Sequence, residues 1–153
     1  MKKPKVIIGW KEWCAFPDLG MPAVKAKVDT GAKTSALHAY DIKPFTKDGQ
    51  KYVRFKVHPL RDDREFEVEC EAPLSDYRVV ISSNGEREKR YVIRTAMSIG
   101  PKLFVTEVTL TARHQMAYRM LLGRDCIRKA KFVVDPAKSC LQGKIKDAHD
   151  LYH

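Results

Sequence analysis

Val28-Asp29-Thr30-Gly31-Ala32 is the most informative segment of this sequence. Before it, residues 23–28 alternate apolar and basic side chains, and this period of two predicts a β-strand with one buried face. A carboxylate therefore stands at the end of a strand, and Gly31 lets the chain turn sharply because glycine has no Cβ. The sequence predicts an aspartate displayed on a tight loop. The chain contains this Asp-Thr-Gly once.

Met120-Leu121-Leu122-Gly123-Arg124-Asp125 is the second informative stretch. Here an apolar pair leads directly into Gly-Arg-Asp. We expect a short helix to begin at Asp125, since aspartate is a favourable N-cap residue.

Short alternating segments and turn residues make up most of the remaining chain. Lys47-Asp48-Gly49-Gln50 and Ser83-Asn84-Gly85-Glu86 predict hairpin turns, since Asp-Gly and Asn-Gly tolerate positive φ. Residues 34–39 form either a helical turn or a short strand, and Pro73 is expected to end a strand unit. The other expected strands span residues 6–10, 23–28, 52–57, 66–70, 79–81, 91–95, 103–110 and 132–136. This order predicts an all-β barrel or sandwich.

The length of 153 residues and the 44% share of hydrophobic residues suit a single domain over residues 1–153. We expect its core at about residues 5–137 and a tail over 138–153 that is helical or frayed. No apolar stretch is long enough to cross a bilayer, and the one behind Met1-Lys2-Lys3 is too short for a signal peptide. We therefore expect a cytoplasmic protein with no membrane contact and free thiols at its scattered cysteines.

The chain is strongly basic, with 29 Lys and Arg against 19 Asp and Glu and a net charge of +10. A basic surface attracts polyanions, which include nucleic acid, anionic membrane and acidic polypeptide. The basic residues are spread along the chain without a long basic block, so a solvated surface with no dedicated partner is the plain alternative.

A single aspartate loop supplies half of a known kind of site. If two such loops meet, their carboxylates share one proton, because like charges a few ångström apart do not both ionise easily. One carboxylate then acts as general base on a water, while the protonated one polarises the carbonyl of a peptide bond. With one Asp29 in each chain, the second carboxylate must come from a second copy, and we expect a homodimer about a two-fold axis.

The order of these features resembles the retropepsins. A strand precedes Asp29, a hairpin at Ser83-Asn84-Gly85 takes the place of the flap, and Gly123-Arg124 follows with a short helix and a last strand. The resemblance implies an all-β, retropepsin-like closed barrel with a short C-terminal helix. The interval from Asp29 to Gly85 is longer than in those enzymes, which predicts an inserted hairpin unit at about residues 40–75.

Residues 26–39, residues 82–85 with Glu88 and Arg90, and residues 120–124 resemble more closely a bacterial family that carries the label ATP-dependent zinc protease. This resemblance covers roughly residues 5–137. Its members are often associated with ATP-grasp ligases that add glutamates to a ribosomal protein, which implies association with such a ligase system. The resemblance implies catalytic roles for Asp29, Thr30 and Gly31, substrate binding by Ala32, Lys33, Ser83, Asn84 and Gly85, and support of the site by Gly123, Arg124 and Asp125.

The zinc and ATP of that label have no motif in the sequence. There is no His-Glu-x-x-His and no Gly-rich nucleotide loop with Lys and Ser or Thr, and His38, His58 and His114 lack ligand spacing. A zinc site assembled from His38, Cys14 and a carboxylate is the alternative. We expect no metal and no cofactor, with His38 partly buried and hydrogen-bonded.

Lys33 departs from the viral retropepsins, which carry an acidic residue four positions after the catalytic aspartate to pair with the arginine of the Gly-Arg element. Arg124 therefore needs another acceptor, and the candidates are Asp125, Asp41 and a backbone carbonyl. Lys33, together with the basic residues at 87, 89 and 90 beside the flap, favours an acidic substrate, unless these side chains are merely solvated.

The leading hypothesis is a homodimeric aspartic peptidase that hydrolyses acidic, glutamate-rich peptides. A non-catalytic basic module that binds an acidic polypeptide or RNA is the second hypothesis. A metal-dependent protease, as the family label implies, is the third.

Overall fold

The computed structural model describes residues 5–61, 63–81, 85–112 and 117–152, and strands dominate it. The strands are β1 (Ile7–Ile8), β2 (Lys11–Phe16), β3 (Met21–Val28), β4 (Ala36–His38), β5 (Tyr40–Lys47), β6 (Gln50–Val57), β7 (Val68–Ile81), β8 (Arg87–Ile99), β9 (Lys102–Thr111), β10 (Met120–Leu122) and β11 (Val133–Val134). The helical elements are the α-helix α1 (Arg124–Ala130) and the 3₁₀ turns η1 (Pro17–Leu19) and η2 (Ala148–Tyr152).

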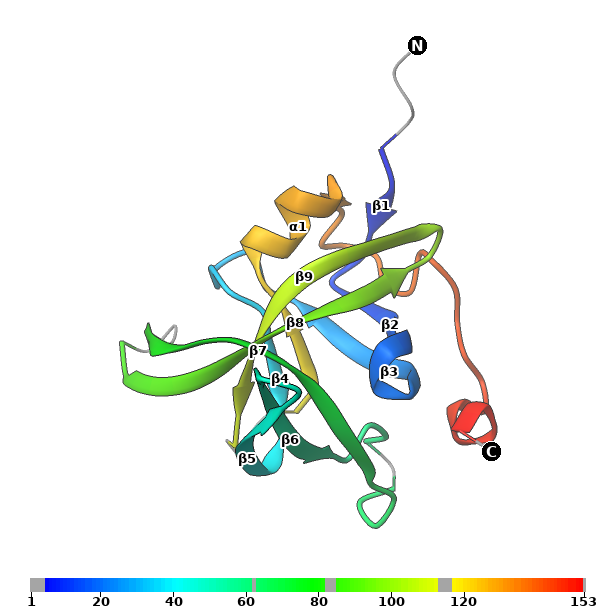
Figure 1. Cartoon of the computed structure of the whole chain (residues 1–153). Helices are drawn as coiled ribbons and strands as arrows, with labels where there is room; N and C mark the ends of the chain where they lie inside the picture. The colour runs from blue at the N-terminus through cyan, green and yellow to red at the C-terminus, as the bar shows by residue number, and fades with distance from the viewer. Residues whose placement is uncertain (1–4, 62, 82–84, 113–116, 153) are drawn as a thin grey trace.

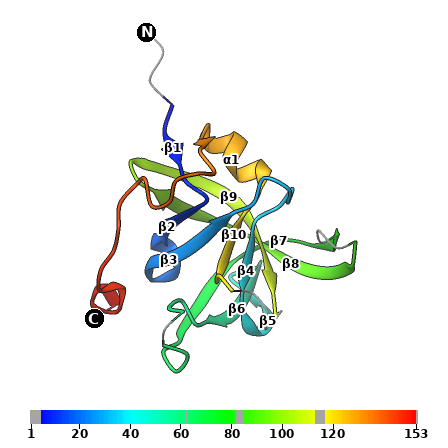
Figure 2. The ribbon, with the colours of Figure 1, turned by 180° about the vertical axis from the view of Figure 1, so that it is seen from behind.

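The body of the molecule is a closed barrel. Its strands follow the order β2-β3-β10-β4-β9-β8, and an antiparallel pairing of Ala15 in β2 with Ser98 in β8 closes the ring of six strands. The short strand β10 lies between β3 and β4, parallel to β3 and antiparallel to β4 (Figure 2). The prediction of an all-β closed barrel with a short C-terminal helix is confirmed.

The strands β7, β6 and β5 extend the sheet from β8, outside the ring. The β5–β6 turn has Asp48 at φ 51° and Gly49 at φ 79°, the conformation that the Asp-Gly signal predicts. β7 and β8 form a long hairpin that projects from the barrel body (Figure 1). Residues 40–75, predicted to be an inserted unit, contain β5, β6 and the first part of β7.

Pro73 does not end a strand, contrary to the sequence-based expectation. β7 runs without a break from Val68 to Ile81, and Pro73 pairs with Tyr52 of β6 while the next residue, Leu74, pairs with Ile93 of β8. The proline therefore stands where the strand exchanges one neighbour for another, a point at which a missing N–H is tolerated.

The expected strand over residues 6–10 is also interrupted. β1 ends at Ile8, and β2 begins only at Lys11. A Cβ on Gly9 would lie 2.3 Å from the carbonyl oxygen of Lys138, so the chain bends where the C-terminal segment presses against it. β11 is not part of the barrel either, because it pairs with β1 alone in a two-stranded parallel sheet.

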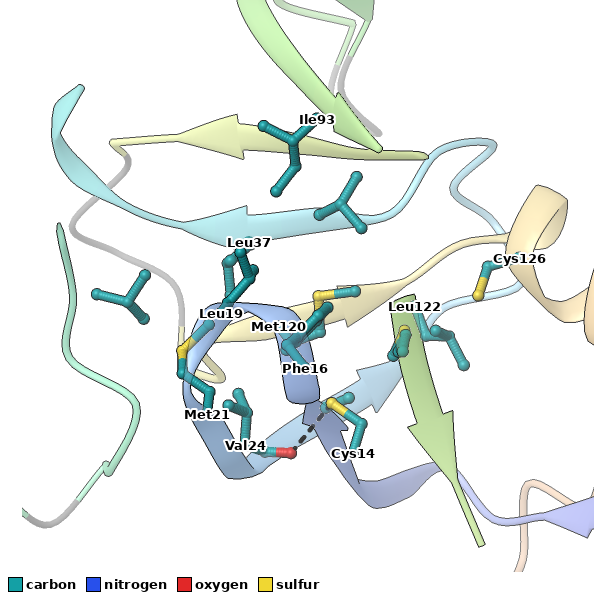
Figure 3. Packing of buried hydrophobic residues seen from close by; sticks show 14 of the residues in the cluster. Cys14, Phe16, Leu19, Met21, Val24, Leu37, Ile93, Met120, Leu122 and Cys126 are labelled. Carbon is teal, nitrogen blue, oxygen red and sulfur yellow. Dashed lines mark hydrogen bonds between the residues drawn. The ribbon is translucent and has the colours of Figure 1, made fainter. Parts of the chain in front are cut away.

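The core fills the barrel with side chains from alternate positions of its strands. In β2 the even-numbered residues from 12 to 16 point inward and the odd-numbered ones are half-buried. Figure 3 shows Cys14 among these apolar side chains, where its thiol donates a hydrogen bond to the carbonyl oxygen of Val24 at 3.2 Å. The four cysteines are free thiols, as predicted. Within the described residues no helix is long and apolar enough to cross a membrane.

The C-terminal tail docks on the barrel through a buried carboxylate. Glu12 is fully buried, and its Oε2 accepts hydrogen bonds from the backbone N–H groups of Gly9 at 2.7 Å and Leu141 at 2.8 Å. Its Oε1 accepts a third from Gln142 at 3.0 Å. Further along, the hydroxyl of Tyr152 in η2 donates to the carbonyl oxygen of Ala23. The tail is therefore held at both ends, and its described helical part is the 3₁₀ turn η2.

Replacing Glu12 by Gln is expected to lower the free energy of unfolding by about 2 kcal/mol, because an N–H donor would then face backbone donors that the carboxylate satisfies. Chemical denaturation measures this loss. Glu65→Gln, an exposed substitution with the same change of charge, is the control and is expected to change stability by less than about 0.5 kcal/mol. Equal stabilities of the two variants would contradict the structural role given to Glu12.

Candidate active site

Asp29 lies directly after β3, on a loop whose shape its own side chain helps to set. The backbone N–H of Asp29 donates to the carbonyl oxygen of Leu122 in β10 at 2.9 Å. The carboxylate oxygen Oδ1 accepts the N–H of Gly31 at 2.9 Å, and the N–H of Ala32 returns to the carbonyl of Asp29 at 3.2 Å. Thr30 and Gly31 are exposed. The carboxylate is thus oriented by backbone bonds at the surface end of a buried strand.

The Gly-Arg-Asp element is bonded to this loop along its whole length. Arg124 N donates to the carbonyl of Ala32 at 2.8 Å, and Asp125 N donates to that of Lys33 at 3.0 Å. The N–H of Gly123 donates to the hydroxyl of Ser35 at 3.0 Å. A Cβ on Gly123 would lie 2.6 Å from the carbonyl carbon of Thr34, so only glycine allows the two segments to approach this closely.

The helix that follows differs by one residue from the expectation. α1 begins at Arg124, with Gly123 as its N-cap and no side-chain cap, so Asp125 lies in the first turn and is not the cap. A glycine suits this position because the close contact with Thr34 excludes any larger capping residue. Asp125 remains near the helix N-terminus, where a negative charge is favourable.

Arg124 finds its acceptor on the aspartate loop itself. Its Nη1 donates to the carbonyl oxygen of Thr30 at 3.0 Å, so the backbone carbonyl is the acceptor among the three candidates. Asp41 instead forms an ion pair with Lys56, with 3.7 Å between Asp41 Oδ2 and Lys56 Nζ. A backbone carbonyl, not an acidic side chain, therefore holds the Arg124 guanidinium, and Lys33 lines the cleft.

A second set of bonds links the loop to the β7–β8 hairpin, and sequence reasoning missed it. The carbonyl oxygen of Ser35 accepts both the N–H and the hydroxyl of Thr109 in β9, each at 2.9 Å. Arg90 of β8 is buried, donates to the Thr109 hydroxyl at 3.4 Å, and pairs with Glu88 at 3.0 Å. Residues 26–39 and Arg90 belong to the motifs that resemble the family, but no local sequence pattern connects them to Thr109.

The aspartate loop and the β7 side of the hairpin enclose a cleft of about 690 Å³. Asp29, Gly31, Ala32 and Lys33 line one wall, and Leu121 and Asp125 lie beside them. The hairpin contributes residues 78–81 and Arg90. Gly85, a predicted substrate contact, is exposed with φ 82° and is not among the lining residues. The other two predicted contacts on the hairpin, Ser83 and Asn84, fall outside the described residues.

Cations outnumber carboxylates on the walls of the cleft. The cations are Lys33, Arg78, Arg90 and Arg124, and the carboxylates are Asp29, Glu107 and Asp125. Glu107 is ion-paired with Arg78: a hydrogen bond from Ser75 at 2.6 Å lowers the pKa of Glu107, and Arg78 lowers it further while burial opposes both.

Cys126 lies behind the aspartate loop as an inert thiol. Burial raises the pKa of Cys126 to about 11, although hydrogen bonds with Thr106 and Ser35 and the charge of Lys129 oppose the shift. A thiol with this pKa is protonated at neutral pH and is a weak nucleophile. It serves as packing beneath the loop.

The residues that could have formed a zinc site do not come together. Within the described ranges, no group of three or more His, Cys, Asp or Glu side chains is placed to hold a metal ion. Cys14 is buried in the core, hydrogen-bonded to a carbonyl, and burial raises its pKa far above the usual range, which disfavours the thiolate that zinc requires. His38 is buried, where the sequence-based expectation was partial burial, and His114 lies outside the described residues.

Comparisons with known proteins bear on the same region. A family model described as RimB-like, the retropepsin-like aspartic endopeptidase RimB, matches residues 7–145. The chain is 48% identical over 141 residues to a probable alpha-L-glutamate ligase of Desulfotalea psychrophila, covering 92% of this chain and 30% of that protein. It is also 48% identical over 147 residues to one of Shewanella pealeana, covering 96% of this chain and 32% of that protein. The chain thus spans about a third of the length of the curated relatives it matches.

A crystal structure of a Legionella pneumophila protein of unknown function has the same fold. The two chains superpose with a TM-score of 0.77 at 30% sequence identity, over 91% of this chain and 99% of that one. These likenesses agree with the match over residues 7–145 and with the barrel that carries a single Asp-Thr-Gly loop. The chain belongs to the RimB-like family of retropepsin-like aspartic endopeptidases.

Proposed function

We propose that the protein is an aspartic peptidase whose active site forms in a homodimer, with one Asp29 from each subunit. The observation that carries this proposal is the Asp29 carboxylate, fixed by the N–H of Gly31 on a loop that lines a cleft of about 690 Å³. The family match supports it, as does the single copy of the loop in the chain.

The reaction follows from two carboxyl groups that share one proton. The ionised carboxylate takes a proton from a water as that water attacks the carbonyl carbon of the scissile peptide bond. The protonated carboxyl group donates a hydrogen bond to the carbonyl oxygen, where negative charge develops. The tetrahedral intermediate collapses when the peptide nitrogen receives a proton and leaves as an amine. The pair returns to its starting state with one shared proton.

The substrate class that suits the cleft is an acidic, glutamate-rich peptide. Lys33, Arg78 and Arg90 line the cleft beside the aspartate loop. Glutamate side chains placed there would pair with Lys33 and compete with Glu107 and Glu88 for Arg78 and Arg90, while the aliphatic parts of Val80 and Leu121 offer apolar contact for the peptide. The names of the relatives, probable alpha-L-glutamate ligases, support an association with a ligase of the kind that produces such peptides.

Cleavage of a glutamate-rich peptide is the experiment that tests this function. Specific activity is expected to rise with protein concentration and to level off where analytical ultracentrifugation detects dimers, because a monomer holds only one carboxylate of the pair. The pH profile of kcat/KM is expected to be bell-shaped, since a pair of coupled carboxyl groups titrates in two macroscopic steps. Activity per subunit that stays constant for a protein that is monomeric throughout would contradict the dimeric site.

The names of the relatives also favour a second candidate function. A domain that makes up about a third of a probable glutamate ligase could hold the acidic product of that ligase without cleaving it. The same assay separates the two functions, because a binding module would retain the intact glutamate-rich peptide at every protein concentration.

A further inference from the structure

A surface of cations and aromatic rings leads away from the cleft over one outer face of the barrel. We call it the basic strip. Its cations are Lys11, Lys25, Lys27, Arg61, Arg64 and Arg119, and its rings are Trp10, Trp13 and Tyr118.

The backbone pairing places the start of the basic strip at the wall of the cleft. Lys27 of β3 pairs with Leu121 of β10, and Leu121 lines the cleft. On its other side Lys27 pairs with Lys11 of β2, and two residues earlier Lys25 pairs with Trp13. Cross-strand partners share a face of the sheet, so these side chains lie on the face that Leu121 presents to the cleft. Figure 2 shows β2, β3 and β10 as neighbours in this part of the barrel.

Ring contacts hold the cations of the basic strip in place and connect them. Lys11 Nζ lies 4.8 Å from the Trp10 ring centre, and the Trp10 ring meets that of Tyr118 edge-on at 6.1 Å. The guanidinium of Arg61 lies 4.3 Å from the ring centre of Tyr118. At the far end, Lys25 Nζ is 5.4 Å from Trp13. Such contacts restrain long basic side chains without neutralising them.

The cations of the basic strip lack the carboxylate partners seen elsewhere on this protein. Within the described part of the chain none of them forms an ion pair, whereas Arg54, Lys56, Arg78 and Arg90 all do. Arg119 is half-buried, and its enclosed Nε has no hydrogen-bond partner among the residues that the structure describes. Burial lowers the pKa of Arg119, and the nearby charges of Arg64 and Arg61 lower it further. Like charges gathered around an unsatisfied donor are typical of a site for an anionic ligand.

We propose that the basic strip is an extended binding site for carboxylates of the substrate that lie several residues from the scissile bond. This inference rests on the proposed peptidase function. The strip is continuous with the cleft through Lys27 and Leu121, so an extended peptide held at Asp29 would pass from one to the other. The planar guanidinium groups of Arg61 and Arg119 suit carboxylate oxygens, which they can engage in pairs. The strip therefore selects substrates by the number of acidic residues they carry beyond the cleft.

Two peptides with the same central, cleavable segment test the proposal. One carries flanking glutamates and the other carries flanking glutamines. The wild-type protein is expected to cleave the glutamate-flanked peptide with a kcat/KM about tenfold higher, mainly through a lower KM, because each exposed ion pair contributes a few-fold in affinity. This preference is expected to shrink as salt is added. In the double variant Arg61→Gln, Arg119→Gln the preference should fall to about twofold or less.

The matched control is Lys43→Gln, Lys51→Gln, which removes the same charge from exposed positions of the β5–β6 hairpin. It should keep the full preference for the glutamate-flanked peptide. A preference lost equally in both double variants would reflect net charge and would overturn the proposal. So would equal cleavage of the two peptides by the wild-type protein.

A binding measurement separates the strip from the peptidase function. In the Asp29→Asn background, fluorescence anisotropy of the labelled glutamate-flanked peptide should report binding that Arg61→Gln, Arg119→Gln weakens about tenfold. Such binding without any cleavage by the wild-type protein would support the strip and remove the peptidase function. Cleavage by the wild-type protein, together with peptide binding that Arg61→Gln, Arg119→Gln leaves unchanged, would support the peptidase function and overturn the proposal for the strip. Tight binding of a single-stranded RNA, with the glutamate peptide unable to compete, would assign the strip to nucleic acid and overturn the proposal.

Discussion

Replacement of Asp29 by Asn is expected to reduce kcat for peptide cleavage by roughly 10²- to 10⁴-fold, the usual contribution of a general base. An amide cannot take the proton of the attacking water. The fold should survive, because Asn retains an Oδ1 that can accept the N–H of Gly31, and the backbone bond from residue 29 to Leu122 does not depend on the side chain. Kinetics on a glutamate-rich peptide, with the melting temperature of the same samples, measure both expectations.

Asp18→Asn is the matched control, because it removes one carboxylate at an exposed position in η1, away from the cleft lining. Its activity should equal that of the wild-type protein. Undiminished cleavage by Asp29→Asn would sink the aspartic-peptidase proposal. A mixture of wild-type and Asp29→Asn chains adds a further test, since heterodimers carry one carboxylate and should be inactive, so that activity falls faster than the wild-type fraction.

Features held by local contacts could be predicted from the sequence. The Asp-Thr-Gly loop follows from an alternating strand, a carboxylate and a glycine within residues 23–31, and its shape depends on bonds between Asp29, Gly31 and Ala32. The Asp48-Gly49 turn is equally local, because two residues with positive φ determine it. The family resemblance added the Gly-Arg element, which is distant in sequence but has a recognisable motif.

Features held by distant contacts could not be predicted in the same way. The break between β1 and β2 arises because Lys138 approaches Gly9, and nothing near residue 9 signals the approach. The acceptor of Arg124 is a carbonyl, an atom that every residue carries, so the sequence left three candidates. Glu12 lies beyond the strand expected over residues 6–10, and it is fully buried because the distant tail supplies backbone donors for its carboxylate.

Gly123→Ala is expected to have the largest effect on stability, lowering the free energy of unfolding by about 3 kcal/mol through overpacking and broken hydrogen bonds. The new Cβ would lie 2.6 Å from the carbonyl carbon of Thr34 and 2.9 Å from the carbonyl oxygen of Lys33. These are backbone atoms, which cannot swing aside as the end of a side chain can. The two segments must separate, and the bonds from Arg124 to Ala32 and from Asp125 to Lys33 stretch or break.

Catalysis should suffer more than stability implies, because those bonds fix the loop that displays Asp29. A shift of about 1 Å in a catalytic group can cost 10²-fold in rate, so cleavage by the folded fraction of Gly123→Ala should fall by about that factor. Gly20→Ala is the control. Gly20 has φ 70° with nothing within 4 Å of an added Cβ, so alanine there costs about 1 kcal/mol of backbone strain and leaves the loop untouched. Its kcat should stay at the wild-type value. If Gly123→Ala matched Gly20→Ala in both unfolding free energy and kcat, the close contact between the two segments would not be what positions the carboxylate.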